Sequence, residues 1–255
     1  MPHRLTSFFF EHRLIFLISA LFAFCSSGVI GFPIWFQQSS FQCFISNKWE
    51  ECDENKICGQ SMIFQLNPSN TIKTLTTDLN LVCERKAIYR FIISGMFLGG
   101  FMGCLFNIIL SIPTQHRLKA LGILGLIFGM AKLAIILFYH YVYILAFALF
   151  TISFCCMSIN SYCFAAVNEI FPAKIAKVYS VVLTLSWGTF GVVFSIFSYL
   201  VNSNWKIVIL MPAIPVLIVS VGLLLVDIKK YENIKAVIIF LILIQQTQLN
   251  FYLAQ

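Results

Sequence analysis

The chain of 255 residues is 60% hydrophobic and only 11% charged, and its mean hydropathy is +0.89. A soluble domain of this length needs far more polar surface to cover its core, so the composition excludes a soluble globular protein. The net charge is +7, and many of the basic residues lie beside apolar segments. Nothing in their pattern indicates a nucleic-acid partner.

Six apolar stretches are each long enough to cross about 30 Å of hydrocarbon as a helix. In chain order they are Leu14–Phe36, Ala87–Ile112, Leu118–Phe138, Val142–Ala166, Val178–Val201 and Ile207–Val226. We therefore expect an all-α polytopic membrane protein with a six-helix bundle over residues 14–226. The short connections predict that consecutive helices are antiparallel neighbours. The first stretch could instead be a signal peptide, but its apolar run is about twice the usual length and no small-residue cleavage site follows it.

Lysines and arginines near the ends of these stretches predict a cytoplasmic N-terminus, residues 1–13. Trp35 and Trp205 then fall at the outer boundary, where aromatic residues are common. The tail, residues 227–255, lies in the cytoplasm or on the membrane surface, because its nine-residue apolar core is too short to span. We expect the plasma membrane rather than an internal membrane.

The only long polar connection, residues 37–86, lies on the predicted outer side and carries four cysteines. They are Cys43, Cys52, Cys58 and Cys83. An even number outside the cell predicts two disulfides, with three possible connectivities. A zinc site is the alternative, but neither a C-x2-C pair nor clustered histidines supports it.

Gly95, Gly99 and Gly103 are four residues apart and share one helical face. Missing side chains on such a face allow a second backbone to approach closely. The face is interpreted either as ordinary membrane-helix packing or as an interface that slides during a transport cycle.

Lys132 is the charged residue deepest in the predicted hydrocarbon, and such a residue is a candidate functional site. It lies about two turns from the outer end of its span, so the alternative is that its side chain snorkels to water. Asn160, Tyr162 and Trp187 could line a solute path, since aromatic faces suit organic cations. Hydrogen bonding between helices explains the polar side chains equally well.

No catalytic motif is present in the sequence, and the four histidines all lie at termini or span ends. We therefore expect that the protein is not an enzyme and has no cofactor and no metal site.

Three segments carry a family resemblance. The segment "DLNLVCERKAIYRFIISGMFLGGFMG" resembles the loop and second helix of the organic cation and organic anion transporters, which belong to the major facilitator superfamily. "NEIFPAK" (Asn168–Lys174) resembles the end of that family's fourth helix. Trp205 and Lys206 ahead of two prolines resemble the entry to its sixth helix, and the order of the segments extends the resemblance over Leu14–Val226.

The resemblance implies one six-helix half of a major facilitator fold. It implies that Gly95, Gly99 and Gly103 lie at a moving interface. It also implies that Glu169, followed by Pro172 and Lys174, joins a charge network that holds one conformation. The alternative for Glu169 is a solvated loop charge.

The second helix departs from the family pattern where it ends. Major facilitators have Gly-x-x-x-Asp-Arg-x-Gly-Arg-Arg there, but this chain has Ile108 at the glycine, Ile112 at the aspartate and Pro113 at the arginine. Arg117 alone keeps a basic character. An isoleucine cannot pair with an arginine, so the acid of the family's gate latch is missing.

The resemblance therefore implies transmembrane transport of a small organic solute by alternating access, as a half-length or truncated major facilitator. Its partners would be the lipid bilayer, the solute, and a second copy or a complementary six-helix half. Two alternatives stay open. One is a non-transporting scaffold or receptor-like membrane protein, and the other is a small homodimeric transporter or channel that associates through the glycine face.

Overall fold

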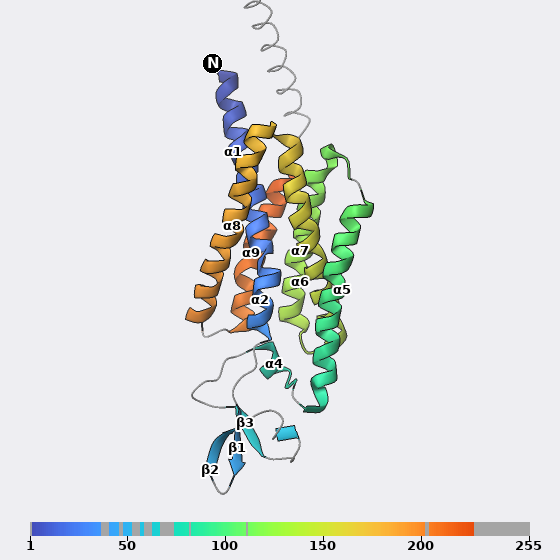
Figure 1. Cartoon of the computed structure of the whole chain (residues 1–255), viewed down its shortest axis with the longest axis vertical. Helices are drawn as coiled ribbons and strands as arrows, with labels where there is room; N and C mark the ends of the chain where they lie inside the picture. Colours follow the sequence, from blue (N-terminus) through green and yellow to red (C-terminus); the bar gives the residue numbers. More distant parts are fainter. Residues whose placement is uncertain are drawn as a thin grey trace, which may run out of the picture.

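The computed structural model describes residues 2–36, 41–45, 48–52, 57–58, 63–66, 74–81, 83–110, 112–201 and 204–226. The predicted tail, 227–255, lies outside the described residues. Long helices run side by side, and a small sheet lies beyond the end of the bundle opposite to the N-terminus (Figure 1). Among the described residues, six candidate spans are long and apolar enough to cross a membrane, in agreement with the six predicted stretches.

The helices follow the apolar stretches closely. Their bounds are α1 Pro2–Cys25, α2 Ser27–Trp35, α4 Leu75–Asp78, α5 Lys86–Ile109, α6 Thr114–Phe138, α7 Val142–Ile170, α8 Ala173–Leu200 and α9 Trp205–Leu224, with a 3-10 turn, η2, at Cys83–Arg85. The first candidate span, His12–Trp35, includes the end of α1 and all of α2. The other five spans are α5 to α9.

The first span is interrupted at Ser26, a break that the apolar pattern did not predict. Ser26 Oγ donates to the carbonyl of Ala23 at 2.5 Å, and Ser27 Oγ donates to the carbonyl of Phe24 at 2.6 Å. Hydroxyls that bond to the preceding turn compete with the helical ladder and bend helices. The two consecutive serines therefore explain why α1 ends and α2 begins here.

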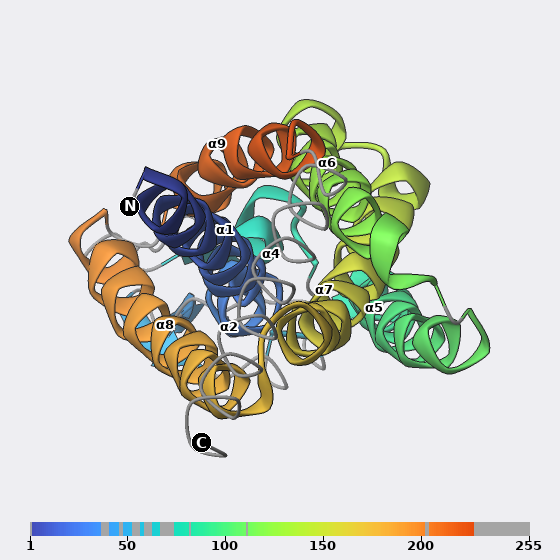
Figure 2. The same ribbon diagram turned by 90° about the horizontal axis from the view of Figure 1, so that it is seen from above.

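The helices do not pack in sequence order throughout, so the expectation that consecutive helices are neighbours was partly wrong. The largest interfaces join α5 to α7, α6 to α9 and α6 to α7, whereas α5 does not pack extensively on α6, nor α8 on α9. Viewed from above, α8 and α5 lie at opposite ends of the bundle (Figure 2). Glycine-rich faces, rather than short connections, bring α5 to α7 and α6 to α9.

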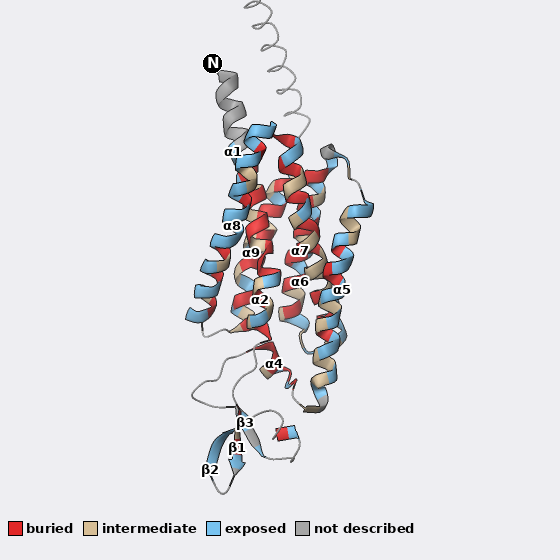
Figure 3. Ribbon diagram, in the orientation of Figure 1, coloured by how far each residue is buried: buried red, intermediate tan, exposed pale blue. Residues whose placement is uncertain are grey.

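The α6–α9 interface is one example. A methyl group added to Gly125 would lie 2.1 Å from Ser220 Oγ, and one added to Gly129 would lie 2.7 Å from the side chain of Leu217. Neither position has room for a larger residue. The interior of the bundle is correspondingly buried, while α8 and much of α5 are exposed (Figure 3).

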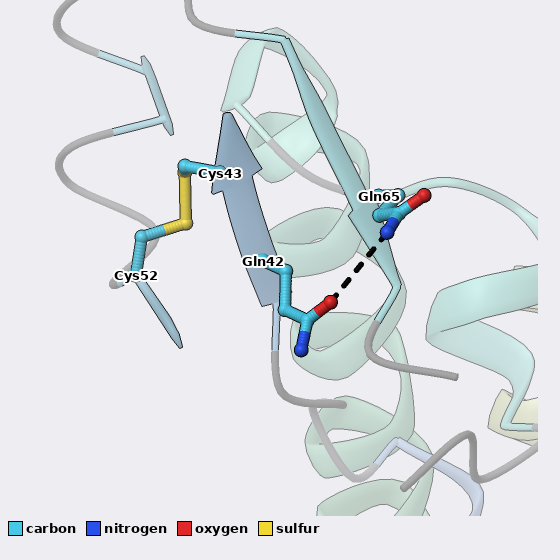
Figure 4. Close-up of a disulfide and its surroundings, with 4 residues drawn as sticks. All are labelled: Gln42, Cys43, Cys52 and Gln65. Atoms are coloured by element: carbon cyan, nitrogen blue, oxygen red, sulfur yellow. Dashed lines mark hydrogen bonds between the residues drawn. A yellow bond between two sulfur atoms is a disulfide. The ribbon is translucent and has the colours of Figure 1, made fainter. Parts of the chain in front are cut away.

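The outer loop contains a three-stranded antiparallel sheet, which was not predicted from the sequence. The strands β1 Phe41–Ile45, β2 Lys48–Cys52 and β3 Phe64–Leu66 have the order β2-β1-β3. Disulfides join Cys43 to Cys52 and Cys58 to Cys83, and the first of them joins β1 to β2 (Figure 4). The two predicted disulfides are confirmed, and one of the three possible connectivities is selected.

Candidate functional site

The glycine face of α5 lies directly against α7. A methyl group added to Gly99 would lie 2.2 Å from the carbonyl oxygen of Phe150, and one added to Gly103 would lie 2.5 Å from that of Phe154. Gly95 is less tightly packed, with 3.8 Å to the carbonyl oxygen of Ala146. Contacts advance by four residues on both helices in the same direction, so α5 and α7 pack as parallel helices.

Polar side chains extend this seam toward the predicted cytoplasmic end. Asn107 Nδ2 donates to the carbonyl of Met157 at 3.4 Å, and Ser158 Oγ donates to the carbonyl of Gly103 at 3.4 Å. The glycine face is thus occupied within the chain itself. It is not exposed for a second copy, which removes the structural basis for a dimer formed through this face.

A charged junction joins the ends of α5, α6 and α7 that are predicted to be cytoplasmic. The guanidinium of Arg117 forms an ion pair with the carboxylate of Glu169, and its Nη2 donates to the carbonyl of Ile112 at 3.0 Å. Arg117 is buried, whereas the side chain of Glu169 is 37% exposed. Glu169 therefore belongs to a charge pair, and its interpretation as a merely solvated loop charge was wrong.

The connection between α5 and α6 supplies backbone acceptors at this junction. The carbonyl of Ile112 accepts from Arg117, and the carbonyl of Leu110 accepts from the hydroxyl of Tyr162 at 3.2 Å. These contacts could not be predicted from the sequence, because backbone carbonyls leave no signature in the residue types.

Pro172 and Lys174 lie just beyond this junction. Helix α7 ends at Ile170, and α8 begins at Ala173, directly after Pro172. Proline is well tolerated ahead of a helix because it has no N–H to leave unsatisfied. Lys174 is exposed on the first turn of α8.

Lys132 is completely buried, with 0% of its surface exposed, so the interpretation that it snorkels to water was wrong. Its ammonium donates to Ser27 Oγ, next to the break in the first span. It also lies 4.8 Å from the ring centroid of Phe128 and 5.3 Å from that of Trp35. These are cation–π distances, so two aromatic faces and one hydroxyl surround the charge.

The other predicted path residues do not converge on Lys132. Asn160 is half-buried on α7 with its Nδ2 4.0 Å from Cys156 Sγ, and its buried Oδ1 has no partner among the described residues. Trp187 is 38% exposed on α8, and no hydrogen bond or ring contact joins it to the other candidates within the described part of the chain. The hydroxyl of Tyr162 bonds to the carbonyl of Leu110 at the charged junction instead.

An aromatic network at the outer end was not predicted. Trp205 Nε1 donates to Asp78 Oδ2 at 2.9 Å, which anchors α4 and the outer loop to the start of α9. Lys206 lies 4.6 Å from the ring of Tyr139 and 5.4 Å from that of Trp205. A clue was present in the sequence, because an aromatic-basic pair at a span boundary commonly anchors a helix.

No protein-family model, curated protein or solved structure matches the chain. Within the described residues, no cluster of three or more histidine, cysteine or acidic side chains could hold a metal ion.

Proposed function

We propose that this bundle is one of two six-helix bundles between which a small organic solute crosses a membrane by alternating access. The observation that carries the proposal is a symmetry of helix packing. The first span (α1 and α2) packs on the fifth (α8) and the sixth (α9). In the same way, the fourth span (α7) packs on the second (α5) and the third (α6). The first and fourth spans also contact each other, as do the third and sixth. If spans one, two and three are exchanged with spans four, five and six in that order, each main pair of packed helices is therefore converted into another packed pair or into itself.

This exchange is expected for an inverted repeat, because three spans per unit place the second unit upside down relative to the first. Six-helix halves of major facilitators consist of such repeats, with the solute bound near the midplane. The α7–α8 contact is the clearest departure from the symmetry in this chain. The symmetry supports the family resemblance in the sequence independently of any motif.

Exposure supports a second bundle. Among the six spans, α5 and α8 are the least buried. Only 28% of the apolar 18-residue segment of α5, and 17% of that of α8, is buried inside the chain. They are the second and fifth spans, which are counterparts under the exchange. A complementary bundle that covers both would enclose a path along α7 and the first span.

Uptake of labelled organic cations and anions by cells that express the full chain tests the proposal. We expect saturable uptake of at least one compound above that of cells without the chain. Gly99→Leu should abolish it, because the added side chain cannot fit against α7. Gly95→Ala is the control and should retain uptake, since the nearest atom to a methyl group added there, the carbonyl oxygen of Ala146, lies 3.8 Å away. Absence of uptake across the panel, with the protein at the cell surface, would contradict the proposal.

Binding of an extracellular partner is the second candidate function, and one observation favours it. The outer sheet exposes Phe44, Trp49 and Ile63 on one face, with side-chain exposures of 41%, 42% and 71%. Exposed apolar groups that gather on one face commonly mark interaction sites. Under this alternative, Trp49→Ala should abolish partner binding to whole cells, while a transporter should retain its uptake.

A further inference from the structure

No acidic side chain among the described residues pairs with the ammonium of Lys132. The described acidic side chains lie elsewhere: Glu169 at the cytoplasmic end, Asp78 at the outer end, and Glu50 and Glu51 in the outer sheet. Buried charges are normally paired, since isolation in a medium of low dielectric constant is costly. The hydroxyl of Ser27 and two aromatic faces are only partial compensation for a full charge.

A second buried donor lies beside this charge. Trp35 is 0% exposed, and its Nε1–H has no acceptor among the described residues. The ammonium of Lys132 lies over the ring of the same tryptophan, 5.3 Å from its centroid. Unsatisfied buried donors are rare and call for a specific explanation.

No described neighbour accepts a hydrogen bond from Trp35 Nε1. Ser27 Oγ already accepts from Lys132 and donates to the carbonyl of Phe24. The carbonyl of Cys25 accepts from Cys156 Sγ at 3.2 Å. Two groups thus lie together next to the break between α1 and α2. One is the positively charged ammonium of Lys132, which has no acidic partner among the described residues, and the other is the buried N–H of Trp35, which has no described acceptor.

We propose that Lys132 and Trp35 bind a monovalent anion in the interior of the bundle. The anion is a halide or the carboxylate of a small organic molecule, because both accept hydrogen bonds and carry the missing charge. The site extends the proposed function, which leaves the sign of the solute's charge open, and its carboxylate form rests on that function. An organic cation would be repelled there by the ammonium.

Thermal unfolding of the purified full chain in detergent tests the site. A thiol-reactive dye reports unfolding, since Cys25, Cys155, Cys156 and Cys163 are free and buried. Sodium chloride and sodium benzoate are titrated at constant ionic strength, with sodium sulfate as the balancing salt. We expect a saturable rise in the unfolding temperature on the order of 5 °C with at least one of them.

Lys132→Met should remove this rise, whereas Lys206→Met should keep it. Lys206 is the matched control, because it also lies over two aromatic rings but at the outer end of the bundle. If Lys132→Met does not fold, Trp35→Phe answers the question, since it keeps an aromatic ring, although a smaller one, and removes the N–H. Trp35→Phe should lower the affinity for the anion about fivefold to tenfold.

A response to chloride alone supports a halide site, and a response to benzoate alone supports a carboxylate site. The proposal is overturned if neither anion gives a saturable rise, or if the rise persists in Lys132→Met. Binding without uptake would leave the anion site standing and count against the proposed function, so the two can fail separately.

Discussion

At the scale of single residues, the tightest constraint is the absence of side chains on α5. Gly99 lies so close to α7 that a methyl group would overlap the carbonyl oxygen of Phe150 at 2.2 Å. Carbonyl groups inside a helix cannot move aside without breaking its hydrogen bonds. The interface can therefore relax only by separating the two helices.

Gly99→Ala should lower the free energy of unfolding by about 2 kcal/mol or more, because overpacking a rigid interface has this cost. Gly188→Ala should change it by less than about 1 kcal/mol, since its added methyl group meets nothing within 4 Å. Denaturant titration of the purified variants measures both values. Equal effects at the two positions would contradict the packing described for α5 and α7.

The second residue-scale prediction concerns the ion pair between Arg117 and Glu169. Glu169→Gln leaves the buried guanidinium of Arg117 without its counter-charge, and the loss should be about 1–3 kcal/mol. Lys174→Gln is the control, because Lys174 is exposed and should be neutral within about 0.5 kcal/mol. Unfolding temperatures of the two variants in the same detergent decide the point. An unchanged value for Glu169→Gln would show that the pair contributes nothing.

At the scale of elements, α4 connects the disulfide-linked loop to the bundle. Leu75 and Leu79 are buried in the main core, and Asp78 accepts the hydrogen bond from Trp205. A capping box between Thr74 and Thr77 stabilises this single turn. The outer sheet is therefore attached to the bundle beside α9.

Trp205→Phe should loosen this attachment, because it removes the hydrogen bond to Asp78 and retains the ring. We expect a cost of about 1 kcal/mol and faster cleavage of the outer loop by an added protease. Trp187→Phe serves as the control, since Trp187 makes no such bond within the described residues. Equal cleavage rates in both variants would contradict the role assigned to Trp205.

The existence of the six spans could be predicted from the sequence, but their pairing could not. Long apolar stretches determine spans directly, since only a helix satisfies its own backbone in lipid. Pairing depends on which faces fit: Gly99 fits α7, and Gly125 fits the side of α9 that carries Ser220. The glycines were visible in the sequence, whereas the complementary surfaces were not.

The same limit applied to the candidate site. The depth of Lys132 in its span could be predicted, but its burial depended on Trp35 and Phe128, which lie on other turns and another helix. The partner of Glu169 could not be predicted either, since Arg117 lies far from it in the sequence and only the packing of α6 on α7 brings the two together. The cysteine number predicted two disulfides, and only the folded loop determined their connectivity.

At the scale of the whole molecule, the proposed transport requires a second six-helix bundle beside this one. The interchange of helix pairs and the exposure of α5 and α8 both support a complementary bundle, from a second copy or from further chain. A path between two bundles requires both of them in one particle.

The most direct measurement is therefore the protein mass of the native particle after gentle extraction, by light scattering corrected for detergent. Our account predicts a mass of at least about twice the 29.0 kDa of this chain, because two six-helix bundles must be present. A homogeneous particle of 29.0 kDa that retains its fold would contradict it.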